Sequence, residues 1–364
     1  MNDLDELRQY MIAHAHAQQV SRSTYRQVLE RIDNDDDGSP GSWAVEWSAA
    51  ARAEVRRGRH LDAGHLYNIA RFPYVDGPTR RRAAEEGVRA FGHWARGKQG
   101  IHREELPLAA GTLACWTAGL SGSGRRPLLL AMGGIVSTKE QWGAVLGHFR
   151  RQGMAVVVTE MPGVGENTLP YDKDSPGLLS QLLDTLRDRA DVDHTYVLAM
   201  SFSGHLALRC ALEDRRIRGI VTAGAPVAGF FDDPGWFDGV PRITKDTLGH
   251  LTGVTPEELP GHLRDWALTP RQLRSLEIPV HYLASLRDEI VPPSEAELLR
   301  THVPRLRLLQ TDDVHGSPHH ATQTRLWCAL AIQELRGARG LQATALRGLL
   351  SLVRTRDRLV DVDD

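Results

Sequence analysis

From about Ile101 onward, the chain alternates short apolar stretches with longer stretches in which apolar residues recur every three or four positions. The short stretches are typical of buried strands, and the longer ones of amphipathic helices. This alternation predicts an α/β fold with a mostly parallel sheet, because parallel strands are joined by crossovers that place helices on both faces. The expected strands include residues 128–131, 154–158, 196–199, 217–223, 280–283 and 306–309.

The first hundred residues carry helical patterns and few strand signals. Between residues 42 and 98, apolar side chains recur at spacings near three and four, as amphipathic helices require; they are Trp43, Trp47, Ala51, Val55, Leu61, Leu66, Ile69 and Phe72. An acidic joint with Gly and Pro at residues 33–40 precedes this segment. We therefore expect a helical N-terminal domain over residues 1–100.

The rest of the chain is expected to divide into residues 101–336, the α/β domain, and residues 337–364, a C-terminal helix and tail. A stretch rich in Pro, Gly and Trp, at about 230–273, interrupts the strand–helix alternation. We interpret this stretch as an insertion that covers a site. The alternative is a surface excursion without a role.

Charge and composition argue against several classes of protein. Lys and Arg number 44 against 46 Asp and Glu, a net charge of −2, so no net field attracts nucleic acid or an anionic membrane. No apolar run approaches the roughly 20 residues of a membrane helix, and the polar, acidic start resembles no targeting signal. Three widely spaced cysteines suit reduced, buried thiols. We expect a cytoplasmic protein without metal or organic cofactor.

The strongest local signal lies in residues 196–204, which read YVLAMSFSG. A buried strand leads there into a sharp turn and then into a helix. Such a strained turn needs small residues two before and two after a nucleophile, and Ala199 and Ser203 stand at those positions around Ser201. Ser201 is therefore the candidate nucleophile. Ser203 is the alternative, but the residue two positions after it is His205, which is too large.

A serine nucleophile requires a base that a carboxylate orients, in the chain order Ser, Asp, His. Asp288 follows the apolar strand 278–283 and precedes Ile-Val-Pro, so it is the candidate carboxylate, with Glu289 as the neighbouring alternative. The candidate base is His315, which lies just after the last expected strand and is followed by a glycine. His319 and His320 compete with it.

Acyl chemistry also needs donors for the negative charge that develops on a carbonyl oxygen. The backbone N–H groups of Phe202 and Ile135 are the candidates, with Gly134 as a further one, because glycines at 133 and 134 permit a close backbone approach. The plainer interpretation is that the two glycines only make a tight turn. The segment PGVG at 162–165 lacks the spacing of a dinucleotide-binding loop.

Together these motifs resemble a branch of the α/β-hydrolases that contains dihydropseudooxynicotine hydrolase, fungal polyketide chain-shortening hydrolases of pigment pathways, and related bacterial proteins. The resemblance rests on AMSFSG, LLLAMGGIVSTKEQW, EMPGVGEN and the pair LRDEIVP…DDVHG, and it covers roughly residues 42–335. The N-terminal helical stretch contributes Trp47, Gly58, Ala63, Tyr67, Ala70 and Pro73. Ala199 departs from the pattern, since the family usually has a glycine there.

The resemblance implies an α/β-hydrolase fold with a helical N-terminal domain that caps the site and often helps to form a homodimer. It implies hydrolysis of esters, or of carbon–carbon bonds in 1,3-dicarbonyl compounds, on a hydrophobic, polyketide-like small molecule of specialised metabolism. It also implies a substrate-binding acid in the insertion, for which Asp232 is the candidate and Asp233 the neighbour.

Two other functions stay open at this stage. Some tetronate polyketide pathways, which lead to antibiotics, use a hydrolase-like lyase that eliminates acetate from an acetylated intermediate. In such an enzyme, His315 would remove a proton from carbon, and Ser201 would bind or attack the acetyl group. The other alternative is a non-catalytic binding protein with a hydrolase fold, against which the ordered Ser, Asp and His argue.

Overall fold

The apolar stretches of the second part of the chain form one sheet of eight strands. The computed structural model describes residues 2–338 and 340–360. The strands follow the order β1-β2-β4-β3-β5-β6-β7-β8; the two pairings of β2 are antiparallel and all other pairings are parallel. Their bounds are β1 Ile101–Leu108, β2 Gly111–Ala118, β3 Pro127–Met132, β4 Ala155–Thr159, β5 Asp191–Ala199, β6 Ile217–Ala223, β7 Val280–Ser285 and β8 Leu306–Thr311.

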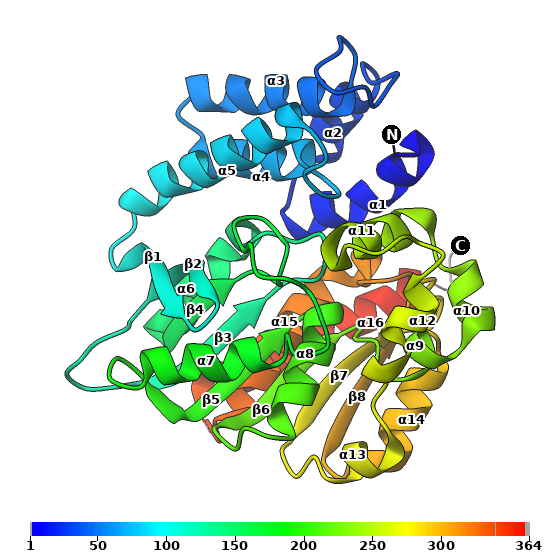
Figure 1. Cartoon of the computed structure of the whole chain (residues 1–364). Helices are drawn as coiled ribbons and strands as arrows, with labels where there is room; N and C mark the ends of the chain where they lie inside the picture. Colours follow the sequence, from blue (N-terminus) through cyan, green and yellow to red (C-terminus); the bar gives the residue numbers. More distant parts are fainter. Residues whose placement is uncertain (1, 339, 361–364) are drawn as a thin grey trace.

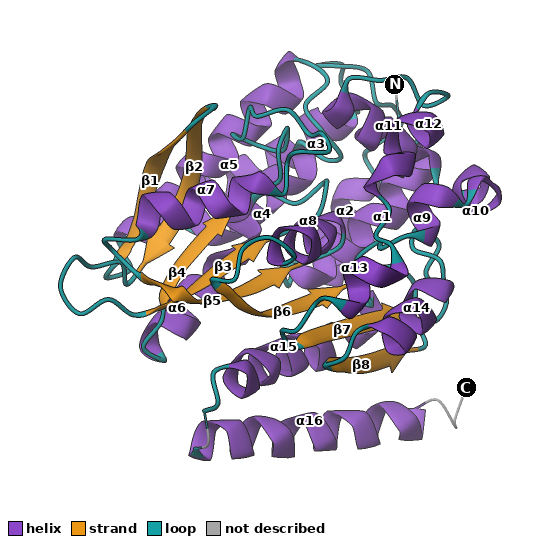
Figure 2. Ribbon diagram, turned by 60° about the horizontal axis from the view of Figure 1, so that its bottom comes forward, coloured by secondary structure: helices purple, strands orange, loops and turns teal. Residues whose placement is uncertain are grey.

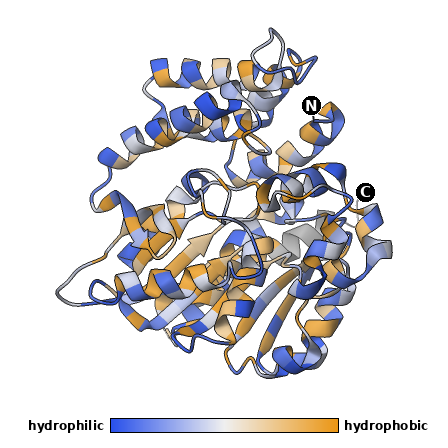
Figure 3. Cartoon of the chain, viewed as in Figure 1, coloured by the Kyte–Doolittle hydropathy of each residue, from blue (hydrophilic) through white to orange (hydrophobic). Residues whose placement is uncertain are grey.

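Successive residues of the central strands enter different hydrophobic cores, because side chains alternate between the two faces of a sheet. In β3, Leu128 and Leu130 pack into the core on one face, whereas Leu129 packs into the core on the other. The first core holds side chains of α7 (Gly177–Leu186), α8 (Phe202–Ala211) and α14 (Ser294–His302). The second holds side chains of α6 (Gly143–Arg151), α15 (Ala321–Leu335) and α16 (Leu341–Val360). Figure 2 shows these helices on opposite sides of the sheet, and Figure 3 shows hydrophobic residues concentrated on its strands.

The predicted α/β-hydrolase architecture is confirmed, including the helical N-terminal part, which Figure 1 shows lying over the sheet. Its helices are α1 Leu4–Ala17, α2 Arg22–Leu29, α3 Trp43–Arg56, α4 His60–Ala70 and α5 Pro78–Arg96. They share a core of their own, into which Trp43, Trp47 and Phe72 are buried. The guanidinium of Arg80 is buried with it and binds Asp35 at 2.6 Å and Asp76 at 3.0 Å.

The stretch 230–273 forms short helices, which pack through Phe230, Leu248 and Trp266 on the first core, the one that contains side chains of α7, α8 and α14. They are α9 Gly229–Asp232, α10 Pro234–Gly239, α11 Arg242–Thr252, α12 Leu259–Leu263 and α13 Pro270–Arg274. The Glu6 carboxylate of α1 accepts from the N–H groups that begin α11, at 3.1 and 2.6 Å. The insertion and the N-terminal helices are thereby joined, as Figure 1 shows for α1 and α11.

A 3₁₀ turn precedes α6, and the tail is helical. The 3₁₀ turn is η1 (Lys139–Trp142), which leads directly into α6. The C-terminal tail forms α16, and its acidic end, 361–364, lies outside the described residues. Each helix within residues 2–338 and 340–360 is too short or too polar to traverse a bilayer.

We expect Gly204→Ala to lower the free energy of unfolding by about 2 kcal/mol, because overpacking forces neighbouring atoms apart. A methyl group at Gly204 would lie 2.1 Å from the Thr222 Oγ1 atom and 2.7 Å from the Ala225 Cβ atom, so α8 would have to move away from β6. Urea denaturation measures the change. Gly261→Ala is the control, since a methyl group there meets no atom within 4 Å and should alter stability by less than about 1 kcal/mol. Equal effects of the two substitutions would contradict this packing.

Candidate active site

Ser201 occupies a strained turn between β5 and α8. Its backbone has φ 57° and ψ −131°, a region that costs a non-glycine residue about 1–3 kcal/mol and persists only where the surroundings hold it. The Ser201 N–H donates to the Ala223 carbonyl of β6 at 2.8 Å, and the preceding Met200 N–H donates to Met132 of β3 at 3.1 Å. The turn thus lies where the sequence predicts it and is bonded to both neighbouring strands.

The side chains of Ser201, His315 and Asp288 form one hydrogen-bonded row. The Ser201 Oγ atom lies 3.1 Å from the His315 Nε2 atom, and the His315 Nδ1 atom lies 2.9 and 3.0 Å from the two Asp288 oxygens. Asp288 follows β7, and its Oδ1 atom accepts from the N–H groups of Ile290 and Val291 at 3.0 and 2.8 Å. These residues come together because the carboxyl ends of parallel strands meet at the same edge of the sheet.

A glycine in the turn after β6 makes room for the row of Ser201, His315 and Asp288. Gly224 has φ 59°, which favours glycine, and a Cβ atom there would come within 2.7 Å of the His315 ring. The small residue therefore lets the imidazole lie between the carboxylate and the hydroxyl. The sequence pattern did not indicate a role for Gly224.

Opposing influences set the pKa of His315. Burial disfavours the imidazolium, but the Asp288 carboxylate and then Glu289 favour it, and the pKa is raised above the ordinary 6.5. The Asp288 contact at Nδ1 leaves Nε2 free to accept a proton from the Ser201 hydroxyl. This geometry suits a general base.

The neighbouring alternatives have other contacts. Glu289 accepts a hydrogen bond from the His315 backbone N–H at 3.0 Å. His319 and His320 direct their Nδ1 atoms at Asp313, at 2.8 and 2.9 Å. Ser203 donates its hydroxyl to the backbone carbonyls of Met132 and Met200. Glu289 and Ser203 therefore bond to the backbone near the row, the two histidines bond to Asp313, and none of the four replaces a member of the row.

Sequence reasoning missed Asp313, which anchors the loop that carries His315. Its buried carboxylate accepts from the backbone N–H groups of Val314, His319 and His320, and it meets both of these imidazoles. Its neighbour Asp312 instead pairs with Arg287 in an exposed salt bridge. An acidic residue two positions before the candidate base was the available signal.

We expect Asp313→Ala to lower the free energy of unfolding by about 3 kcal/mol, because several buried donors lose their acceptor. Asp312→Ala is the matched control and should cost less than about 1 kcal/mol, as surface ion pairs do. Urea denaturation at neutral pH compares the two. If the free energy of unfolding fell no more in Asp313→Ala than in Asp312→Ala, the anchoring role of Asp313 would be contradicted.

The candidate oxyanion donors border the Ser201 side chain. A methyl group added at Gly134 would lie 3.0 Å from the Ser201 Cβ atom and 3.4 Å from its Oγ atom, so the loop between β3 and η1 passes directly beside the hydroxyl. Within the described part of the chain, no acceptor binds the N–H group of Ile135 or Phe202. Both N–H groups are thus available to an oxygen held near Ser201.

Helix α1 brings Tyr10 and His14 to the same region, which its helical sequence pattern did not reveal. Burial raises the pKa of the Tyr10 phenol, and the Glu289 and Glu6 carboxylates raise it further. Burial lowers the pKa of His14 to about 3, and the charges of Arg71 and His315 act in the same direction. Tyr10 and His14 are therefore neutral at physiological pH.

Asp232 is not brought together with these residues. It lies exposed at the end of α9, and no hydrogen bond among the described residues links it to Ser201, His315 or Asp288. Asp233 accepts a hydrogen bond from the Trp236 N–H and caps α10. The substrate-binding role of Asp232 remains a prediction.

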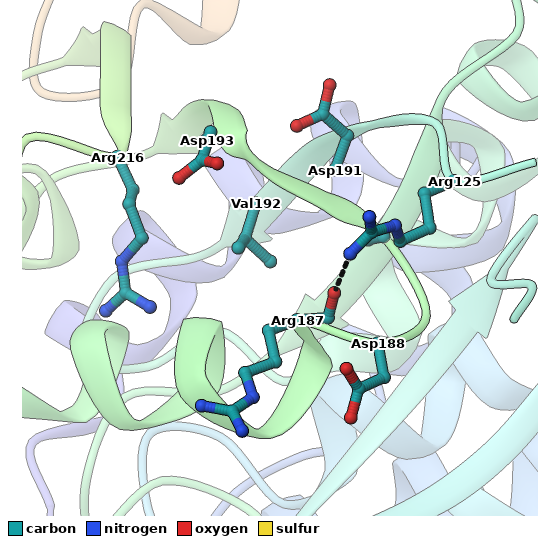
Figure 4. Close-up of a pocket in the computed structure, with 8 residues that line it drawn as sticks. Arg125, Arg187, Asp188, Asp191, Val192, Asp193 and Arg216 are labelled. Carbon is teal, nitrogen blue, oxygen red and sulfur yellow. Dashed lines mark hydrogen bonds between the residues drawn. The ribbon is translucent and has the colours of Figure 1, made fainter.

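Other features of the molecule lie apart from this site. The described residues contain no group of three or more His, Cys, Asp or Glu side chains placed to hold a metal ion. A surface hollow of about 720 Å³ is lined by the residues that Figure 4 draws as sticks. Its lining includes Arg125, Arg187, Asp191 and Arg216, which precede or begin strands β3, β5 and β6. Ser201 follows the opposite end of β5, so the hollow lies at the other edge of the sheet.

Comparison with known proteins agrees with this geometry. The model of the family described as "Esterase FrsA-like" matches residues 40–312. Esterase FrsA from Salmonella schwarzengrund is 27% identical over 309 residues, which are 78% of this chain and 75% of the relative. Esterase FrsA from Photobacterium profundum is 23% identical over 317 residues, 77% and 73% of the two chains.

Solved structures extend the similarity to nearly the whole chain. Wild-type AbyA5 is 51% identical, with a TM-score of 0.93, and the match covers 97% of this chain and all of AbyA5. The 2,6-dihydroxy-pseudo-oxynicotine hydrolase is 23% identical, with a TM-score of 0.66 over 88% of this chain and 95% of that one, and shares the fold. The predicted branch of the α/β-hydrolases is confirmed. The chain is an enzyme of the α/β-hydrolase type and belongs to the FrsA-like esterase family.

Proposed function

We propose that this enzyme is a serine-dependent acyl hydrolase in which Ser201 is the nucleophile, His315 the general base and Asp288 the orienting carboxylate. The observation that carries the proposal is the continuous hydrogen-bonded row, with 3.1 Å from the hydroxyl to the imidazole and 2.9 Å from the imidazole to the carboxylate. Such a row activates a hydroxyl that is otherwise a weak nucleophile at neutral pH.

The reaction follows from the positions of the donors and acceptors. The Ser201 oxygen attacks the substrate carbonyl while His315 takes the hydroxyl proton, and the N–H groups of Ile135 and Phe202 receive the oxyanion. His315 then returns the proton to the leaving group as its bond to the acyl carbon breaks. Water, deprotonated by the same imidazole, hydrolyses the acyl-enzyme and releases the acid with free Ser201.

The second candidate reaction is the elimination of acetate from an acetylated substrate. The His315 Nε2 atom is bonded to the Ser201 hydroxyl, as acyl transfer requires, and the same imidazole would be the base on a substrate C–H group in an elimination. With an acetylated substrate, hydrolysis gives acetate and an alcohol, but elimination gives acetate and an alkene without consuming water. Product analysis therefore separates the two reactions.

The proposed substrate is a hydrophobic, polyketide-like ester or 1,3-dicarbonyl compound of specialised metabolism, a class that the family resemblance of the motifs suggests. The N-terminal helices and the insertion would enclose it, since α1 lies against both α11 and the loop after His315. We also propose a homodimer, which the family resemblance of the motifs implies, and the oligomeric state in solution tests that part.

We expect a fluorophosphonate to add once to the wild-type protein and not to Ser201→Ala, as intact-mass spectrometry will show. Ester turnover should fall by about 10⁶-fold in this variant, as removal of a triad serine does elsewhere. Ser203→Ala is the matched control and should still be labelled, because its hydroxyl bonds only to backbone carbonyls. Labelling of folded Ser201→Ala would refute the assignment of the nucleophile.

The pH dependence of kcat/KM should show an acidic limb with its midpoint above 6.5, because Asp288 and Glu289 raise the pKa of His315 despite its burial. Protonated His315 cannot accept the serine proton, so activity is lost as the pH falls through this value. Glu289→Gln removes one charge that raises the pKa, and its amide oxygen can still accept the His315 N–H. We expect the limb to move to lower pH in this variant; an unmoved limb would be inconsistent with the electrostatic origin of the shift.

A further inference from the structure

The β3–η1 loop, residues 133–138, is held by a helix of the N-terminal part. Arg71, which follows α4, donates from its Nη2 atom to the Val136 carbonyl. The Thr138 hydroxyl donates to the Asn68 side-chain oxygen of α4 at 2.6 Å. In the same loop, Gly134 lies against Ser201, and the N–H group of Ile135 has no acceptor among the described residues. A contact with α4 therefore bears directly on the backbone that would receive the oxyanion.

Arg71 is a buried cation, and among the described residues no carboxylate lies within hydrogen-bonding distance of its guanidinium. Only 2% of the residue is exposed. Its Nη1 atom donates to the Pro73 carbonyl at 3.1 Å, and its buried Nε atom has no acceptor in the described part of the chain. Burial lowers the pKa of Arg71 to about 10, although the more remote carboxylates of Glu160 and Glu140 favour the charge. The guanidinium is therefore charged at neutral pH.

Other buried cations of the chain differ from Arg71 in this respect. Arg80, 3% exposed, binds the carboxylates of Asp35 and Asp76. Lys139 lies between three carboxylates at 2.7–3.2 Å. Cations that stabilise a fold are usually paired in this way, because an unpaired buried charge is destabilising. Within the described part of the chain, the Arg71 side chain instead donates its hydrogen bonds to backbone carbonyls, one of them in the β3–η1 loop.

We propose that Arg71 is a positioning residue of the active site, which holds the β3–η1 loop through the Val136 carbonyl so that the Ile135 N–H is directed at the substrate oxyanion. The proposal rests on the acyl chemistry proposed above, and it makes the helical N-terminal part necessary for catalysis. Prearranged donors contribute most when they need not move during the reaction. Arg71 supplies that arrangement from outside the hydrolase sheet.

The electrostatic interactions of Arg71 agree with its location close to the reacting atoms. His14 is influenced by the charges of both Arg71 and His315, so one side chain of α1 lies near the guanidinium and near the base. A cation in this region also favours a nearby oxyanion over the neutral carbonyl, since opposite charges attract more strongly where water is excluded.

The test compares Arg71→Met with Arg80→Met, a matched loss of a buried guanidinium that contacts no residue of the β3–η1 loop. For each folded protein, we would measure the rate of fluorophosphonate labelling, kcat and KM for 4-nitrophenyl acetate, and the melting temperature. Arg71→Met should label about 10²-fold more slowly and lose a similar factor in kcat, as removal of an oxyanion donor does. Its KM should change little. Millimolar guanidinium should restore part of the rate.

In Arg80→Met, we expect a lower melting temperature with a wild-type labelling rate in the folded fraction and no response to guanidinium. Wild-type labelling by Arg71→Met, or an equal loss in both variants without rescue, would overturn the proposal. Should Arg71→Met fail to fold, Arg71→Lys and Thr138→Val decide: slowed labelling in both supports the role, and wild-type rates in both refute it. Absence of an adduct on the wild-type protein would instead refute the proposed acyl chemistry, so the two failures are distinguishable.

Discussion

The backbone of Ser201, with φ 57° and ψ −131°, is the constraint on which the surrounding structure depends. A serine does not adopt this conformation on its own, so hydrogen bonds to β3 and β6 and the close packing of Gly204 against Thr222 must maintain it. The parallel sheet supplies these supports because its central strands are buried on both faces and cannot shift independently. The strain is the cost of projecting the hydroxyl beyond the end of β5, where a base and N–H donors can reach it.

The site combines parts of the chain that are distant in sequence. The ends of β7 and β8 provide Asp288 and His315, and the loop after β3 provides N–H groups beside the hydroxyl. The N-terminal helices add Arg71 and Asn68 behind that loop. Removal of these helices would therefore leave a sheet with its three polar side chains but with a loop that had lost two of its hydrogen bonds. The N-terminal part thus bonds directly to the loop that borders Ser201.

The sequence predicts the sheet, the strained turn and the three polar residues because each leaves a local signal: an apolar strand, small residues around Ser201, or a polar residue at a strand end. Arg71 and Tyr10 left no such signal, since a polar residue in a helical pattern is normally exposed. The burial of Arg71 and the partial burial of Tyr10 follow from the packing of the N-terminal helices on the hydrolase part, which periodicity within one helix cannot reveal. Asp232, in contrast, was suggested by the family resemblance but does not lie beside Ser201, His315 or Asp288. A resemblance between motifs does not determine the direction in which such a side chain points.

The most direct measurement is a crystal structure of the wild-type protein after reaction with a fluorophosphonate. We predict phosphorus bonded to the Ser201 Oγ atom, with the phosphoryl oxygen about 2.7–3.1 Å from the N–H groups of Ile135 and Phe202, as an oxyanion hole requires. We also expect Arg71 still to donate to the Val136 carbonyl. Phosphorus on another side chain would contradict the assignment of Ser201 as the nucleophile. A phosphoryl oxygen directed away from both N–H groups would contradict their role as oxyanion donors.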